Sequence, residues 1–322
     1  MIASAPGQIF LFGEHAVVYS QPALAAPIDL RTRVKSESRD DMRVLVDSEG
    51  VGKLEGVVRG KGGQWTIEKK SGDVRELEHV VKAVESTFSH LGDGGGLELE
   101  ILSDIPVGSG LGSSSAVTTA TIAATSAVMG EVLDGEDVSE LAFSAEKAVQ
   151  GPASRTGVSV ATQGGFARIQ GREMENLEEL PPLDIVIGYT GIYGSTAETV
   201  RRVKQLRESN PMITNPILET IGAITQAGIQ AVKEGDFKKV GALMNANQNL
   251  LEGLRVSSED LDRLITAARG SGALGAKLTG GGGGGSMIAL SESDPQGIVE
   301  AIKEVGGQPI ATEIGVEGLK VE

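Results

Sequence analysis

The sequence contains no cysteine and only three histidines. Without cysteine the 322-residue chain can form neither a disulfide nor a thiolate metal site, which fits a reducing cytoplasm. The histidines His15, His79 and His90 are widely separated in the chain and suggest no histidine cluster. We therefore expect any metal ion to be a hard cation held by oxygen atoms.

Positive charge is also scarce. The chain has 29 basic and 44 acidic residues, so its formal net charge is −15. This sign argues against a protein that binds nucleic acid through its overall charge, although a local site for a small anion remains possible. The N-terminus has no basic leader, and Glu14 and His15 interrupt its apolar run. We expect no signal peptide, no membrane span, and neither nucleic acid nor membrane as a partner.

The order of sequence patterns predicts an α+β fold with two lobes. Alternating segments such as QIFLFG, RTRVKSES, MRVLVDSEG and GQWTIEKKSG predict strands in the first half, followed by a helix over residues 74–92. Helical periodicity dominates later, at residues 195–209, 215–235, 236–254 and 257–272. Pro181 and Pro182 mark a boundary between an expected N-terminal lobe, residues 1–180, and a C-terminal lobe, residues 181–322.

The segment PVGSGLGSSSAV joins a predicted strand to a predicted helix at residues 113–130. Its glycines allow positive φ and a close approach to the backbone, while its serine hydroxyls can reach a phosphate or a metal. A flexible turn with a serine N-cap is the simpler alternative. The candidate phosphate-binding residues are Pro106, Gly108, Ser109, Gly110, Leu111, Gly112, Ser113, Ser114 and Ser115. The spacing differs from that of P-loop NTPases and of dinucleotide-binding folds.

Two further segments are equally unusual: SAPGQIFLFGEHAVVY near the start and AKLTGGGGGGSMIAL near the end. Together, in this order, the three segments resemble the GHMP kinases, and within them the archaeal form of the mevalonate kinases. The resemblance implies an N-terminal lobe like domain 2 of ribosomal protein S5 and a ferredoxin-like C-terminal lobe. It implies ATP and Mg²⁺ as cofactors, and phosphorylation of the 5-hydroxyl of mevalonate in isoprenoid biosynthesis. We also expect a cytoplasmic homodimer.

The same resemblance implies roles for individual residues. ATP phosphates would lie on the loop from Pro106 to Ser115, with Gly282 and Gly283 of the third motif also at the nucleotide. Mg²⁺ would be held by Ser114 and Glu146, and the substrate would face Glu14, His15, Ser195 and Thr196. Each has a plainer alternative: Glu146 as a solvated helix residue, His15 as a core histidine, and the six glycines as a linker.

Two positions depart from the family pattern. Gln8 stands where the first motif usually has lysine, and Gly157 stands where a catalytic aspartate usually follows the metal-binding glutamate by eleven residues. Neither residue can accept a proton or supply a positive charge. Arg155, beside this position, could meet an anionic substrate, or be a surface arginine.

Several functions remain open on these grounds. The chain could be a working, weakly active kinase without a general base, because phosphoryl transfer depends mainly on positioning and electrostatics. It could instead be a catalytically impaired relative that still binds ATP, or a regulatory protein without activity. A kinase for a different small hydroxylated substrate is a further alternative, while mevalonate is the substrate we expect first.

Overall fold

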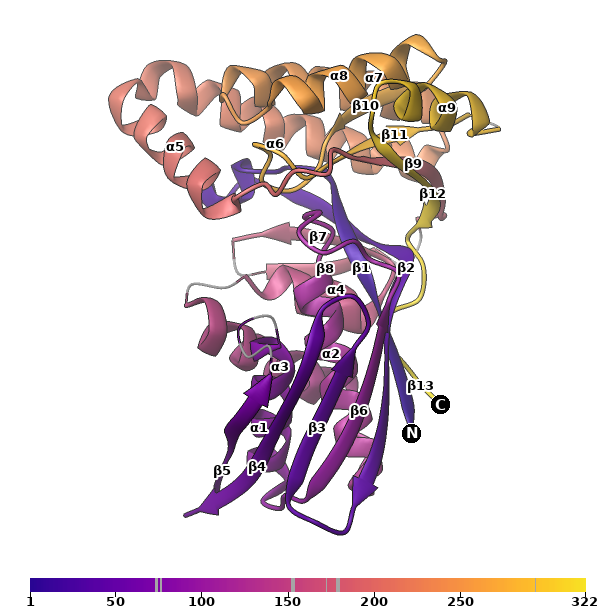
Figure 1. Ribbon diagram of the computed structural model, residues 1–322. Coiled ribbons are helices and arrows are strands. Elements are labelled where there is room, and N and C mark those ends of the chain that lie inside the picture. The colour runs from indigo at the N-terminus through magenta and orange to yellow at the C-terminus, as the bar shows by residue number, and fades with distance from the viewer. Residues whose placement is uncertain (73–74, 76, 152–153, 172, 178–179, 293) are drawn as a thin grey trace.

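The structure is a computed structural model that describes residues 1–72, 75, 77–151, 154–171, 173–177, 180–292 and 294–322. It has the expected α+β architecture. The paired strands run through both halves of the molecule in the order β10-β11-β9-β12-β2-β6-β3-β4-β5, with β1, β7, β8 and β13 attached beside this path. Figure 1 shows the C-terminal helices packed at one end of this sheet and the earlier helices against its other end.

Strand β2 (Ala23–Arg39) connects the two halves. Its first residues pair with β7 (Phe166–Gln170), Ile28 pairs with β12 (Gln308–Ile314), and its last residues pair with β6 (Gly96–Ser103). Strand β1 (Ile2–Phe12) runs antiparallel along most of it. Residues on β1 are therefore held in register with both halves, which matters for the site below.

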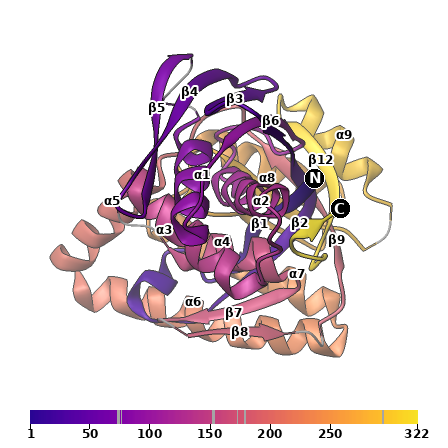
Figure 2. The same ribbon diagram turned by 90° about the horizontal axis from the view of Figure 1, so that it is seen from below.

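Helices cover one face of the sheet in the N-terminal half. The remaining elements here are β3 (Arg43–Ser48), β4 (Gly52–Lys61), β5 (Gln64–Gly72), β8 (Glu173–Leu177), α1 (Glu78–Leu91), α2 (Ser113–Val128), α3 (Gly135–Gln150) and α4 (Arg155–Gln163). Helix α2 consists almost entirely of Ala, Ser, Thr, Ile and Val, and most of its residues are buried. Small side chains on all sides allow close packing, so α2 lies among α1, α3, α4 and the sheet (Figure 2).

The C-terminal half places helices on an antiparallel sheet. Its elements are β9 (Leu183–Tyr189), β10 (Gly275–Leu278), β11 (Ser286–Leu290), α5 (Thr196–Ser209), α6 (Pro211–Glu234), α7 (Phe237–Gly253), α8 (Glu259–Gly270) and α9 (Gln296–Glu304). A short 3₁₀ helix, η1 (Ala16–Tyr19), follows β1 and contacts α6. One apolar cluster combines residues of β1 and β2 with residues of β9, β11, α6 and α7. The core is thus continuous between the halves.

The last residues of the chain return to the N-terminal half. Strand β13 (Lys320–Val321) pairs antiparallel with β1, so the two termini lie side by side in both views (Figures 1 and 2). The buried guanidinium of Arg31 donates hydrogen bonds to Ser4 and to the carbonyl oxygens of Glu317 and Gly318. The arginine therefore fastens the C-terminal segment to β1 and β2.

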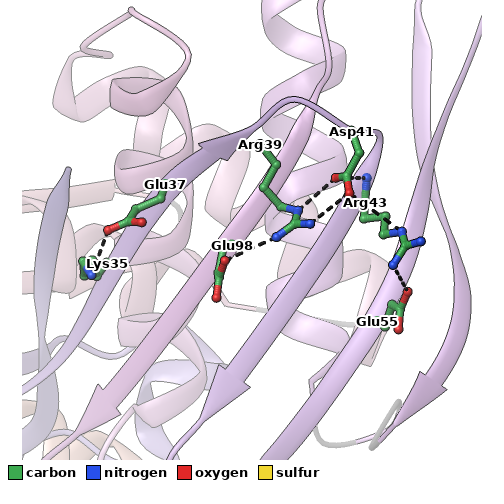
Figure 3. A network of polar contacts seen from close by, with 7 residues as sticks. All are labelled: Lys35, Glu37, Arg39, Asp41, Arg43, Glu55 and Glu98. Atoms are coloured by element: carbon green, nitrogen blue, oxygen red, sulfur yellow. Dashed lines mark hydrogen bonds and ion pairs between the residues drawn. The ribbon is translucent and has the colours of Figure 1, made fainter.

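A network of charged side chains stabilises the far end of β2 (Figure 3). Glu37 and Glu98 lie directly opposite each other on β2 and β6, which would be unfavourable if they were alone. Lys35 pairs with Glu37 at 2.8 Å, and Arg39 pairs with Glu98 at 3.3 Å. Arg39 also makes two hydrogen bonds to Asp41, which lower the pKa of this carboxyl group to about 2. Each carboxylate of the opposed pair therefore has a cation.

Most expected elements are confirmed, including the helix that follows the glycine–serine loop. The helix expected over residues 74–92 is α1, and positions 74 and 76 lie outside the described residues. The sequence patterns missed α4, β4, β8 and β10. Helix α4 reads RTGVSVATQ, in which β-branched residues and glycine disfavour a helix, and its burial in the core overrides this preference. Among the described helices, none has the length and apolarity needed to cross a membrane.

Candidate functional site

A cavity of about 1040 Å³ lies where the two halves meet. The N-terminal half contributes Gln8 of β1, the loop from Gly108 to Ser115, and Glu146 of α3. The C-terminal half contributes Thr196 at the start of α5 and the first glycines of the run at residues 280–285. All three unusual sequence segments therefore reach one cavity, although more than 250 residues separate the first from the last.

The glycine–serine loop has the backbone conformation expected from its sequence. Gly108, Gly110 and Gly112 have φ of 75°, 78° and 75°, values that side chains other than that of glycine rarely allow. Gly112 is the N-cap of α2 and provides no side-chain cap. The first N–H groups of this 16-residue helix therefore face the cavity end of the loop without a side-chain partner.

The loop is fixed at its base by short hydrogen bonds. The hydroxyl of Ser109 donates to the carbonyl oxygen of Pro106 at 2.6 Å, and the hydroxyl of Ser286, on β11, donates to the carbonyl oxygen of Ser109 at 2.9 Å. The backbone N–H of Gln8 donates to the carbonyl oxygen of Leu111 at 2.8 Å. The loop is therefore held to β1 and β11 by hydrogen bonds, which favours a packed loop over the alternative of a flexible turn.

Glu146 is a buried carboxylate beside the start of α2. It is 4% exposed, so it is not a solvated helix residue. The hydroxyl of Ser115 donates to its Oε1 at 2.8 Å. Burial raises the pKa of Glu146, and hydrogen bonds from Ser115 and Ser114 partly oppose this increase. The resemblance assigned Ser114 to the metal; the structure places both serines at Glu146, with Ser114 lining the cavity and Ser115 bonded to the carboxylate.

The other carboxylate of the cavity, Glu14, is held in a buried ion pair. It lies between β1 and η1, and it contacts the ammonium group of Lys277 on β10, which is fully buried. The amide of Asn247, on α7, lies 3.5 Å from the second carboxylate oxygen. Burial raises the pKa of Glu14 and lowers that of Lys277, while the attraction between them opposes both shifts. The pair joins the start of the chain to the C-terminal sheet.

The next residue, His15, connects the same segment to the glycine run. Its Nε2 lies 2.9 Å from the carbonyl oxygen of Gly281, so Nε2–H donates and Nδ1 remains an acceptor in the neutral ring. Burial lowers the pKa of His15 to about 4. Its backbone φ of 61° is uncommon for a residue with a side chain. His15 lines the cavity, which a histidine of the core alone would not do.

The six glycines form a packed loop, so the alternative of a linker is wrong. A Cβ on Gly282 would lie 2.1 Å from the carbonyl oxygen of Val256, and one on Gly281 would lie 2.6 Å from Oγ1 of Thr196. Gly283 donates its N–H to the same Val256 oxygen. Gly280 and Gly281 line the cavity, whereas Gly282 and Gly283 support the loop from behind.

The remaining predicted residues occupy different positions. Ser195 caps α5 and accepts a hydrogen bond from the N–H of Glu198. Thr196, beside it, lines the cavity. Arg155 forms two hydrogen bonds to Glu140 and lies over the ring of Phe143, with its side chain 55% exposed. It is not among the residues lining the cavity, so the structure favours the surface alternative for Arg155.

Gln8 and Gly157 are neighbours. An added Cβ on Gly157 would lie 2.8 Å from Nε2 of Gln8 and 2.2 Å from Oγ of Ser115. Gly157 lies inside α4 and its φ is not positive, so it does not serve a backbone turn. The lack of a side chain at this position provides space for Gln8 and Ser115.

The described lining of the cavity contains no lysine or arginine. Its charged groups are Glu14, which Lys277 neutralises, and Glu146. Nor do three or more histidine or acidic side chains of the described residues gather into a metal site. A carboxylate with two serine hydroxyls suits Mg²⁺, which prefers oxygen ligands and completes its shell with phosphate oxygens and water. The residues present therefore fit Mg²⁺ bound together with a phosphate chain.

Sequence reasoning missed some residues at this site. Lys277 was not singled out, although a lysine within the apolar strand GAKL is a recognisable signal of a buried partner. No sequence pattern marks Asn247, because it lies near Glu14 only through the packing of α7. His79 and Gln150 also line the cavity, and neither belongs to a motif.

Comparisons with known proteins agree with this geometry. The family model described as GHMP kinases N terminal domain matches residues 78–165, and the one described as GHMP kinases C terminal matches residues 229–308. A mevalonate kinase of Thermococcus sibiricus is 42% identical over 330 aligned residues, covering 100% of this chain and 98% of the relative. A mevalonate kinase of Pyrococcus abyssi is 40% identical with the same coverage.

Solved structures give the same result. The crystal structure of the Methanococcus jannaschii mevalonate kinase aligns with a TM-score of 0.82 and 26% identity, covering 97% of each chain. The L. major mevalonate kinase in complex with R-mevalonate aligns with a TM-score of 0.83 and 26% identity, covering 98% of this chain and 96% of that one.

The lowered pKa of His15 predicts how stability depends on pH. Its pKa is about 4 when folded and about 6.5 when unfolded, so below pH 6.5 the unfolded chain binds a proton that the folded chain does not. Stability is lost as the pH falls, by about 2 kcal/mol between pH 7 and pH 5 from this group alone.

Urea unfolding of the parent and of His15→Asn at both pH values measures this contribution. Asparagine tolerates positive φ, and the variant should lose about 2 kcal/mol less than the parent over this range. His90→Asn is the control and should keep the parent's dependence, since His90 is exposed in the last turn of α1 and does not line the cavity. Equal pH dependence in the parent and His15→Asn would contradict a neutral, buried His15.

Proposed function

The chain belongs to the GHMP kinase family, and we propose that within it the protein acts as a mevalonate kinase, transferring the γ-phosphoryl group of ATP to the 5-hydroxyl of mevalonate. One observation supports this most strongly: a single cavity joins the uncapped start of α2 and Glu146 to the segment carrying Glu14 and His15. Its two ends suit a phosphate chain and a small polar substrate.

At the nucleotide end, backbone N–H groups and an oxygen-bound cation replace basic side chains. The loop from Pro106 to Ser115 would hold the ATP phosphates at the positive end of the α2 dipole. Glu146 and the serines beside it would hold Mg²⁺, which supplies charge neutralisation for the phosphates. Since no basic side chain lines the described cavity, binding of ATP must depend strongly on the metal.

At the substrate end, neutral polar groups face the cavity. His15 presents Nδ1 as an acceptor, and Thr196 adds a hydroxyl near Gly281. The carboxylate of Glu14 is paired with the ammonium group of Lys277, so it is not free to act as a base. These groups suit an alcohol that is bound by hydrogen bonds rather than by a cluster of opposite charges.

The transfer itself needs no strong base. The 5-hydroxyl oxygen forms a bond to the γ-phosphorus as the bond to the bridging oxygen of ADP breaks. The hydroxyl proton passes to an oxygen of the transferred phosphoryl group and then to water. A loose transition state develops little negative charge on the attacking oxygen, so positioning contributes most of the catalysis.

The setting of the reaction follows from its chemistry. Use of ATP and the lack of cysteine support a cytoplasmic location. A homodimer remains a prediction, which sedimentation velocity would measure.

Removal of the metal should abolish nucleotide binding. Millimolar Mg·ATP should raise the melting temperature of the parent, because a ligand that binds only the native state stabilises it, and excess EDTA should eliminate the increase. Glu146→Gln should weaken Mg·ATP binding by at least roughly 10- to 100-fold. Glu140→Gln, on the exposed face of the same helix, is the control and should bind normally. An unchanged response in Glu146→Gln would exclude this carboxylate from the metal site.

A screen of acceptors tests the substrate. ADP release should be fastest with mevalonate when it is compared with homoserine, galactose and phosphomevalonate at equal concentration. Faster release with one of the others would retain the kinase and replace the substrate. Binding of Mg·ATP without release for any acceptor would favour a relative without activity.

A further inference from the structure

We propose that the carboxamide of Gln8 binds the acceptor hydroxyl of the substrate, and that the lack of a side chain at Gly157 provides the space that seats it. The proposal rests on the proposed function, and it assigns the positioning of the reacting alcohol to a residue that cannot take its proton.

Gln8 occupies a slot that two glycines keep open. On one side, a Cβ on Gly112 would lie 2.6 Å from Cγ of Gln8. On the other side, a Cβ on Gly157 would lie 2.8 Å from its Nε2. Any other residue at either position would therefore displace the glutamine side chain. Gly112 is already required by its φ of 75°, so the specific evidence for the slot is Gly157, whose φ is not positive and which lies in a separate element, α4.

The backbone of Gln8 is equally well fixed. Its N–H bonds to Leu111 at 2.8 Å, and β1 pairs with β2 on both sides of this residue. A side chain that is anchored in this way has few alternative positions, which is the requirement for orienting a reacting group.

The amide oxygen of Gln8 has no partner within the described structure. It is buried, it accepts no hydrogen bond, and the residue lines the cavity. A buried acceptor without a donor is unfavourable in a folded protein, and a ligand hydroxyl would satisfy it. Because Gln8 lies beside Ser115, whose hydroxyl is bonded to Glu146, a hydroxyl at Gln8 would be close to the metal and the phosphate chain.

A carboxamide accepts hydrogen bonds but is not protonated near neutral pH. Gln8 would therefore hold the hydroxyl oxygen toward the γ-phosphorus without removing its proton, which leaves by the route given above. This role explains why glutamine and glycine occur together: a side chain at residue 157 would displace both the positioning amide and the serine bound to Glu146.

The test compares two ligands in the absence of nucleotide. Titration calorimetry measures the affinity of mevalonate and of 3-hydroxy-3-methylpentanoate, which has hydrogen in place of the 5-hydroxyl. Gln8→Met retains the length of the side chain and removes the amide group that could form hydrogen bonds. It should weaken mevalonate binding roughly 5- to 30-fold and leave binding of the analogue unchanged. Gln205→Leu, an exposed glutamine of α5, is the control for loss of a glutamine.

Each outcome decides a separate question. Equal weakening of both ligands, or of neither, would contradict the contact between Gln8 and the hydroxyl. If the parent itself binds no mevalonate, the proposed function fails before Gln8 is tested. The melting temperature of each variant shows that it is folded.

Gly157→Ala provides a second and independent test. The added methyl group should displace Gln8, so mevalonate binding should weaken as in Gln8→Met, again with little effect on the analogue. Gly270→Ala is the control, because a Cβ at that helical glycine would meet no atom within 4 Å. Normal mevalonate binding by a folded Gly157→Ala variant would contradict the claim that space at residue 157 is needed to seat Gln8.

Discussion

The buried ion pair between Glu14 and Lys277 is the interaction on which the site depends. Both side chains are almost fully removed from water, and each would be strongly unfavourable without the other. Because one partner follows β1 and the other lies on β10, the pair fixes the N-terminal segment against the C-terminal sheet. His15 then reaches Gly281, and the glycine run is held against the substrate end of the cavity.

The pairing of Glu14 with Lys277 also determines how charge is distributed around the cavity. Lys277 lies behind the substrate end and neutralises Glu14, and no lysine or arginine lines the described cavity. Phosphate charge must then be balanced by Mg²⁺ and by the start of α2. The reacting hydroxyl must be held by neutral groups, and Gln8 offers a buried and unsatisfied acceptor among them. We therefore infer that the site depends on positioning rather than on proton abstraction.

The conformation of the glycine–serine loop could be predicted because its information is local: alternating glycines determine φ, and a helix begins directly after them. The sequence also predicted Glu146 and His15 at the site, through motifs. The bond between Ser115 and Glu146, and the packing of Gln8 between two glycines, depend on contacts between distant segments, which no local pattern contains. For Arg155 the local pattern was misleading. Its proximity in sequence to Gly157 suggested contact with an anionic substrate, whereas its side chain bonds to Glu140 on the surface.

The most direct test is a double-mutant cycle on the buried pair, measured as the free energy of unfolding for the parent, Glu14→Gln, Lys277→Met and the double variant. Each single change leaves a buried group without its partner and should cost about 3–5 kcal/mol. The double variant should cost much less than the sum of the two, because it leaves no unpaired charge. Additive costs, or single costs below about 1 kcal/mol as for an exposed pair, would contradict the account.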